Sequence, residues 1–136
     1  MASVIGQLFY PGSGFNGDNF LFVSEDGTIS GWRGALGTSA ETLQLPGANN
    51  VYKGVAFGTG GTDSYVYAAN FHTGKIDVLK GGPGEPDLGG NFTDPTLPSG
   101  FAPFNIVNIG GTLLCYLCEA GFGQGRRRRR RFGDRG

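Results

Sequence analysis

Two segments of the chain share one hairpin pattern at an offset of 47 residues, and this repeat limits the fold more than any other feature. In each segment a compact apolar run leads through a glycine-containing turn into a run that alternates apolar and polar side chains. The pattern covers residues 19–32, with its turn at Gly27, and residues 65–79, with its turn at Gly74. Asp-Gly between two such runs is a strong hairpin signal, because both residues tolerate positive φ. The chain is therefore expected to form consecutive β-hairpins.

A second repeat strengthens this expectation. The glycine pairs Gly60-Gly61 and Gly110-Gly111 lie 50 residues apart, and each follows a short apolar run, at residues 54–57 and 105–108. Repeats of about 40 to 50 residues built from short strands are typical of propeller blades. The chain has 27 glycines and seven prolines, and no long segment shows helical periodicity. We therefore predict an all-β fold of short antiparallel strands, forming about two blades of a β-propeller.

The charge of the chain changes abruptly near its C-terminal end. Residues 1–114 carry four cations and nine carboxylates, whereas residues 115–136 carry seven arginines and two carboxylates. The formal net charge of zero thus averages an acidic body and a basic tail. We assign residues 1–114 to a partial β-propeller and residues 115–136 to a low-complexity, disordered basic tail.

Four motifs in order resemble a known family. They are SEDGTISGW at residues 24–32, YKGVAF at 52–57, AANFHTGKIDV at 68–78 and FTDPTLPSGFAPFNI at 92–106. Together they resemble an uncharacterised bacterial family of exported, NHL-like β-propeller proteins, some of which carry PEP-CTERM sorting tails. The resemblance implies an extracytoplasmic location and a parent protein with more blades. The start MASVIGQLFYPG lacks a signal-peptide pattern, so the chain as written would stay in the cytoplasm.

The tail departs from that family after Leu114. We interpret it as a frame-shifted version of the strand that the family pattern expects there. Arginine CGN codons read one nucleotide later become GNC codons for Asp, Ala, Gly or Val. Residues 114–120 can likewise be back-translated so that the alternative frame spells YVTYAKP. The chain is then a truncated fragment whose polyarginine is out of frame.

Polar residues at predicted strand ends and turns form the candidate ligand-binding set. It consists of Asp26, Asn70, His72, Asp94 and Asn105. Carboxylate and amide oxygens suit Ca²⁺, and lactonase-type propellers use such a metal in their central channel. The competing interpretation is structural: Asp26 and Asn70 serve turn geometry, Asp94 makes local hydrogen bonds, and His72 is a surface turn residue. We expect no cofactor in this chain and consider Ca²⁺ a candidate only in a full-length relative. We assign no catalytic residue.

The tail contains two further motifs. A run of arginines suggests non-specific binding to nucleic acid through phosphate contacts, with Phe122 and Phe132 as the only nearby aromatic residues. The run consists of Arg126, Arg127, Arg128, Arg129, Arg130 and Arg131. Cys115 and Cys118 have the spacing of a zinc half-site, but zinc needs four ligands and no second pair exists, so we treat both cysteines as incidental.

The leading expectation is a non-enzymatic propeller scaffold or ligand-binding protein, present as a fragment. The alternatives are a fragment of a metal-dependent propeller hydrolase or lactonase, and nucleic-acid binding through the basic tail. Unpaired sheet edges predict self-association. No apolar run approaches the ~18 residues that a membrane span requires.

Overall fold

The computed structural model of the 136-residue chain describes residues 3–89, 92, 94–119 and 128–132, the last range by its backbone. In this part of the chain, ten strands form three small antiparallel sheets, with two short 3₁₀ turns between strands. The predicted all-β, antiparallel fold is confirmed. No helix among the described residues has the length and apolarity needed to cross a bilayer.

The first sheet is a four-stranded meander in the order β1-β2-β3-β4. Its strands are β1 (Val4–Phe9), β2 (Phe20–Ser24), β3 (Ile29–Trp32) and β4 (Glu41–Gln44), with 3₁₀ turns at Phe15–Gly17 and Gly34–Leu36. The first predicted hairpin is confirmed: Val23 pairs with Ile29 across a turn in which Gly27 has φ of +85°. That φ lies in the region that glycine occupies without a steric penalty.

The second sheet contains the second predicted hairpin. Its order is β5-β6-β7, formed by β5 (Tyr52–Gly60), β6 (Asp63–Asn70) and β7 (Lys75–Lys80). Ala69 pairs with Ile76 across the turn at Gly74, as Val23 pairs with Ile29 in the first sheet. The segment after β7 then runs past this sheet, and the Phe92 carbonyl accepts a hydrogen bond from the Ile76 amide at 3.3 Å. Phe92 thus occupies the side of β7 that β4 occupies beside β3.

The third sheet extends beyond the sequence-based domain boundary. It has the order β10-β9-β8, with β8 (Phe101–Ile109), β9 (Thr112–Glu119) and β10 (Arg128–Phe132). Cys115 and Leu117 on β9 are buried, because apolar residues continue at the period of two that a half-buried strand requires. Residues 115–119 therefore belong to the folded body rather than to the tail.

Part of the assigned tail also forms a strand. The backbone of Arg128–Phe132 pairs with Leu117–Leu113 of β9, whose second edge would otherwise be open. The sequence repeats predicted about two blades, and the structure has three sheets because β9 and β10 complete another one. Residues 120–127 and 133–136 lie outside the described residues.

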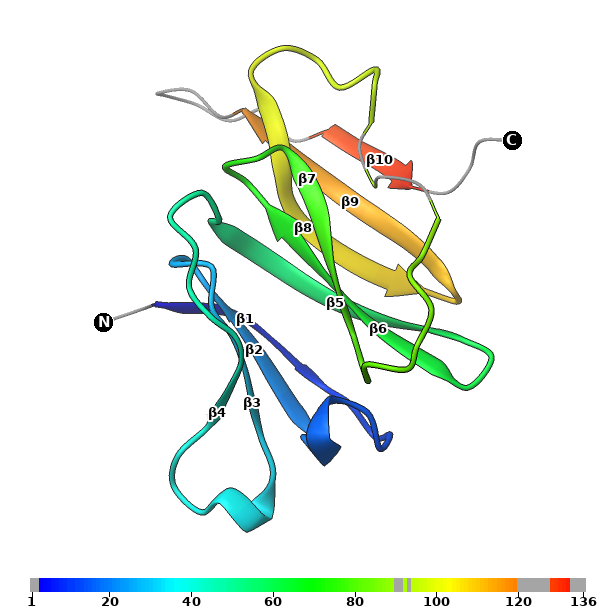
Figure 1. The fold of residues 1–136 in the computed structure, drawn as a ribbon. Helices are drawn as coiled ribbons and strands as arrows, with labels where there is room; N and C mark the ends of the chain where they lie inside the picture. Colours follow the sequence, from blue (N-terminus) through cyan, green and yellow to red (C-terminus); the bar gives the residue numbers. More distant parts are fainter. Residues whose placement is uncertain (1–2, 90–91, 93, 120–127, 133–136) are drawn as a thin grey trace.

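The three sheets stack face to face in chain order, and β5 lies beside both β1 and β8 (Figure 1). Glycine permits this close approach of strands. A Cβ atom on Gly6 of β1 would lie 2.9 Å from Val23 Cγ2 and 3.1 Å from Val55 Cγ1, and one on Gly54 of β5 would collide with Asn105 of β8. Residues larger than glycine at these positions would push neighbouring sheets apart.

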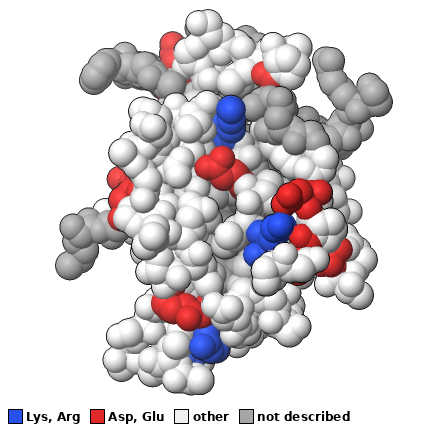
Figure 2. Space-filling model, viewed as in Figure 1, with Lys and Arg blue, Asp and Glu red and all other residues white. Residues whose placement is uncertain are grey.

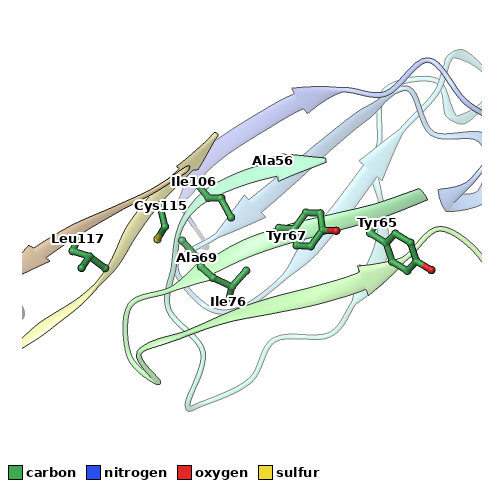
Figure 3. Close-up of a cluster of buried hydrophobic side chains, with 8 residues drawn as sticks. All are labelled: Ala56, Tyr65, Tyr67, Ala69, Ile76, Ile106, Cys115 and Leu117. Carbon is green, nitrogen blue, oxygen red and sulfur yellow. The ribbon is translucent and has the colours of Figure 1, made fainter. Parts of the chain in front are cut away.

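The core consists of the layers between the stacked sheets. Leu21, Val23 and Ile29 of the first sheet pack with Val66 and Ala68 of the second. A separate layer joins the second sheet to the third and is drawn in Figure 3: Ala56, Tyr65, Tyr67, Ala69, Ile76, Ile106, Cys115 and Leu117. Burying each large side chain stabilises the fold by about 1.5 to 3 kcal/mol.

Candidate functional site

A network of buried polar groups surrounds Asn70 at the end of β6. The Asn70 side chain is fully buried, and its Nδ2 donates to Asn50 Oδ1 at 2.9 Å and to Asp77 Oδ2 at 2.8 Å. Its Oδ1 accepts from the backbone amides of Val51 and Thr73, each at 3.2 Å. Donors and acceptors of this amide are therefore engaged by the protein itself, as a buried polar group requires.

The Asn70 network continues into the first sheet through Tyr52. The Tyr52 hydroxyl donates to Asp77 Oδ2 at 3.1 Å and accepts from Gln44 Nε2 at 2.7 Å. Gln44 Nε2 also donates to the Gly27 carbonyl at 3.1 Å. Burial raises the pKa of Tyr52 to about 12, so the hydroxyl keeps its proton as a donor at neutral pH. The network joins the hairpin turn of the first sheet to that of the second.

Asp26 lies in the same region, but its side chain faces its own turn. Its Oδ1 accepts from the Thr28 amide at 3.0 Å, and hydrogen bonds from Thr28 hold the pKa of Asp26 below its usual value. Its carbonyl accepts from the Gly47 amide at 3.1 Å, in the loop that also contains Asn50. The structure thus brings the Asp26 turn and Asn70 to one loop, with each side chain in a turn-forming role.

The other predicted site residues lie on different elements. His72 is exposed in the turn between β6 and β7. Asp94 lies in the segment between β7 and β8, where its Oδ1 accepts from the amide of Thr96 at 2.8 Å and from its hydroxyl at 2.7 Å. Asn105 lies on β8 at a bulge and sits against Gly54 of β5. Within the described ranges, no group of three or more His, Cys, Asp or Glu side chains is placed to hold a metal ion.

A second polar cluster, which the sequence analysis missed, lies at the other end of β2. Asp18 is completely buried, and its Oδ1 accepts from Arg33 Nη1 at 2.8 Å. Arg33 Nη1 also donates to Glu41 Oε1 at 2.6 Å, and Asn16 Nδ2 donates to the same oxygen at 3.3 Å. Arg33 therefore ties together the start of β2, the end of β3 and the start of β4.

One atom of this Asp18 cluster is unusual. In the described part of the chain, Asp18 Oδ2 is buried and has no hydrogen-bond partner, and a Cβ on Gly31 would lie 2.1 Å from it. Burial raises the pKa of Asp18, and the hydrogen bond from Arg33 opposes that rise. The hydrogen bond from Arg33 holds the pKa of Glu41 below its usual value. The two carboxyl groups beside one guanidinium thus differ in acidity because only one of them is fully buried.

Two other described cations, Lys53 and Lys80, also pair with acids. Lys53 pairs with Glu25, and Lys80 Nζ lies 2.9 Å from Asp87 Oδ1. On the face shown in Figure 2, basic side chains sit beside acidic ones and do not gather into a patch.

The two cysteines and the described part of the arginine run of the assigned tail lie on different strands, β9 and β10. Cys115 is buried on β9, where burial raises the pKa of its thiol to about 12, and Cys118 is half-buried. Residues three apart in a strand point to opposite faces, so the two cysteines do not form a ligand pair. The backbone of Arg128, Arg129, Arg130 and Arg131 forms most of β10, and Arg126 and Arg127 lie outside the described residues.

Comparison with known proteins finds a similar viral protein. No family model matches the chain, and no solved structure matches it. The chain is similar to an uncharacterised protein of Acanthamoeba polyphaga mimivirus, with 33% identity over 106 residues. The match covers 72% of this chain and 24% of that relative, so the chain spans about a quarter of the relative's length.

Proposed function

We propose that the chain is a piece of a non-enzymatic, propeller-like scaffold or ligand-binding protein. The observation that carries this proposal is the repeated register of the three sheets. The first strand of each sheet has one irregularity near its start: Val4/Gly6 in β1, Tyr52/Gly54 in β5 and Pro103/Asn105 in β8. A bulge near the start of the first strand in three successive sheets indicates one repeated structural unit.

The arrangement of the units supports a radial stack. The first strands lie next to one another in the order β1, β5, β8, and the later strands of each sheet extend away from this row (Figure 1). In a propeller, first strands line the central channel and each blade packs on the next. The similar viral protein is longer than this chain, which leaves room there for further units.

The use of polar groups supports a structural or binding role over catalysis. The Asn70 side chain accepts hydrogen bonds from two backbone amides and donates hydrogen bonds to Asn50 and Asp77. Asp26 and Asp94 each accept from a residue two positions later in their own turn. An Asx turn of this kind explains an acidic residue without invoking a ligand.

The rival proposal is a fragment of a metal-dependent propeller hydrolase or lactonase, and it can be tested on this chain. Thermal unfolding would be followed with and without millimolar Ca²⁺, with Mg²⁺ as the control, alongside an ester and lactone hydrolysis assay. The scaffold proposal expects the same Tm with either cation and no turnover. A Ca²⁺-specific rise in Tm that disappears in Asn105→Ala or Asp94→Asn, together with turnover, would overturn it.

Nucleic-acid binding is a second candidate because four consecutive arginines form a regular edge strand. Such binding would weaken steeply with salt, as counterions are released from phosphates. Deleting residues 120–136 would remove β10 and keep β9, which carries buried Cys115 and Leu117. If RNA affinity is salt-dependent and disappears with this deletion, the binding belongs to the tail. If the truncated chain retains affinity, the tail is not the binding element.

The proposal extends to the parent protein and its gene. We propose an extracytoplasmic parent related to the bacterial exported propeller family, with the tail read out of frame. Sequencing the coding DNA past the codon for Gly110 tests this directly. An alternative frame that continues into further strands supports the truncated-propeller proposal, whereas a closed frame makes the arginine run a genuine part of the protein.

A further inference from the structure

The first sheet has an aromatic face that no other sheet covers in the described part of the chain. Leu21 and Val23 point toward the second sheet and are fully buried. On the opposite face, Phe9, Phe20 and Trp32 are paired across β1, β2 and β3. Their rings form one row, with centroids 5.5 Å apart for Phe9 and Phe20 and 6.1 Å apart for Phe20 and Trp32. Phe9 remains 55% exposed and Phe20 38% exposed, although aromatic rings stabilise chiefly through burial.

The register of the sheets shows what this aromatic face corresponds to. When the bulges are aligned, Gly6 corresponds to Gly54, so Phe9 corresponds to Phe57 of β5. Phe20 pairs with Phe9, and Val66 pairs with Phe57. By the same alignment, Phe20 therefore corresponds to Val66. Phe57 and Val66 belong to the core layer that packs the second sheet on the first. The exposed face therefore has the positions that form a sheet-to-sheet interface one unit later in the chain.

The third sheet also has a face that no other sheet covers among the described residues, called here its open face. Val107 and Leu114 are paired on β8 and β9 and correspond to Ala56 and Tyr67 in the second sheet. Ala56 and Tyr67 lie in the layer that packs on the third sheet (Figure 3). Val107 and Leu114 are only half-buried and lie on the face of the third sheet that points away from the second.

We propose that the open face of the third sheet in one copy of this chain packs on the aromatic face of the first sheet in a second copy. The occupant is a second copy because the chain itself contains the same interface twice, between its first and second sheets and between its second and third. The contact is head to tail, since each copy contributes a different face. The inference rests on the repeating units of the proposed scaffold and adds how such units associate.

The head-to-tail arrangement can be tested by complementation between two variants of the full chain. Phe20→Glu places a charge on the aromatic face of the first sheet, and Val107→Glu places one on the open face of the third. Leu45→Glu is the matched control, because Leu45 is 77% exposed in the loop between β4 and β5. Sedimentation velocity from micromolar to millimolar concentration would be recorded for each protein and for an equimolar mixture of the two face variants.

Wild type and Leu45→Glu are expected to associate with similar dissociation constants. Each face variant alone should raise that constant by about tenfold or more, because it places an unpaired charge in every contact. The equimolar mixture should recover association, since the Val107→Glu copy keeps an intact first sheet and the Phe20→Glu copy keeps an intact third sheet. Circular dichroism would establish that each variant is folded, with Phe9→Ser replacing Phe20→Glu if the latter fails to fold.

Three outcomes would overturn the inference. They are a wild type that stays monomeric, face variants that associate like wild type, and a mixture that recovers nothing. Association that survives in Val107→Glu but not in Phe20→Glu would indicate a symmetric contact between two aromatic faces instead. These outcomes leave the proposed scaffold role standing, because that role is tested separately by Ca²⁺ dependence and turnover.

Discussion

The two polar clusters at opposite ends of β2 provide hydrogen bonds to a fully buried polar side chain in different ways. In the Asn70 network, an amide that is fully buried makes four hydrogen bonds, two of them to backbone amides. In the Asp18 cluster, a carboxyl that is fully buried depends on Arg33 and has one oxygen without a partner. A neutral amide thus completes its bonding inside a turn, whereas a buried acid depends on one long side chain from another strand. The Asp18 cluster should therefore be the more sensitive to single substitutions and to pH.

The largest effect is expected from removing Arg33. Arg33→Met leaves Asp18 buried without its cation. Breaking a fully buried ion pair in this way costs about 3 to 5 kcal/mol. The loss of stability should be smaller than that here, because the Arg33 side chain is partly exposed. Urea unfolding would measure the loss in free energy of unfolding, with Lys75→Met as the control at an exposed position. Adding Asp18→Asn to Arg33→Met should recover part of the loss. A double variant no more stable than Arg33→Met would show that the charge of Asp18 is not the cause.

A somewhat smaller loss is expected at Asn70. Asn70→Ala removes four hydrogen bonds and leaves Asn50 and Asp77 without this partner, at a cost of about 2 to 3 kcal/mol. Asn70→Asp should cost at least as much, since its carboxylate still accepts from the amides of Val51 and Thr73 but faces the oxygens of Asn50 and Asp77 without a donor. Both values follow from the same urea unfolding measurement. Equal stability of wild type and Asn70→Ala would contradict a structural role for this amide.

The pH dependence of stability should separate the two clusters. Burial raises the pKa of Asp18 in the folded state above its unfolded value near 3.8, with Arg33 and Glu41 as its charged neighbours. Because the folded state holds this proton more tightly, the contribution of Asp18 is present at low pH and falls as pH rises through the folded pKa. Glu41, whose pKa is lowered, contributes in the opposite sense, so its stabilisation is lost as pH falls.

The test compares wild type with Asp18→Asn by urea unfolding from pH 3 to pH 7, a range chosen around ordinary carboxyl pKa values of about 4. Relative to Asp18→Asn, wild type should lose stability as pH increases. Parallel profiles for the two proteins would mean that the Asp18 carboxyl titrates alike in the folded and unfolded states.

The smallest effect is expected at His72, two residues from Asn70. Its side chain is exposed in a turn, so His72→Ala should change the free energy of unfolding by no more than about 0.5 kcal/mol. If His72 is a ligand-binding residue instead, its substitution would leave stability unchanged and reduce the affinity for that ligand. A loss of stability as large as that of Asn70→Ala would show that the turn depends on His72.

Local signals predicted much of this fold because hairpin geometry is decided by a few neighbouring residues. Asp26-Gly27 and Gly74 identified both confirmed hairpins, since these turns require positive φ and apolar strands on either side. The same local geometry is the basis for the structural interpretation of Asn70 and Asp26, which stands beside their predicted ligand-binding role. The boundary at Leu114 came from composition, which does not register that Cys115 and Leu117 continue the alternation of a buried strand.

The amino-acid sequence by itself determined the all-β class, the two hairpins and the repeat, because each follows from residues close together in the chain. Only the tertiary structure decided the third sheet, the open aromatic face and the Asp18 cluster. Asp18, Arg33 and Glu41 come from three separate segments, and their contact exists only once β2, β3 and β4 are paired. Burial and charge pairing are properties of that assembled sheet, so no local pattern in the sequence could indicate them.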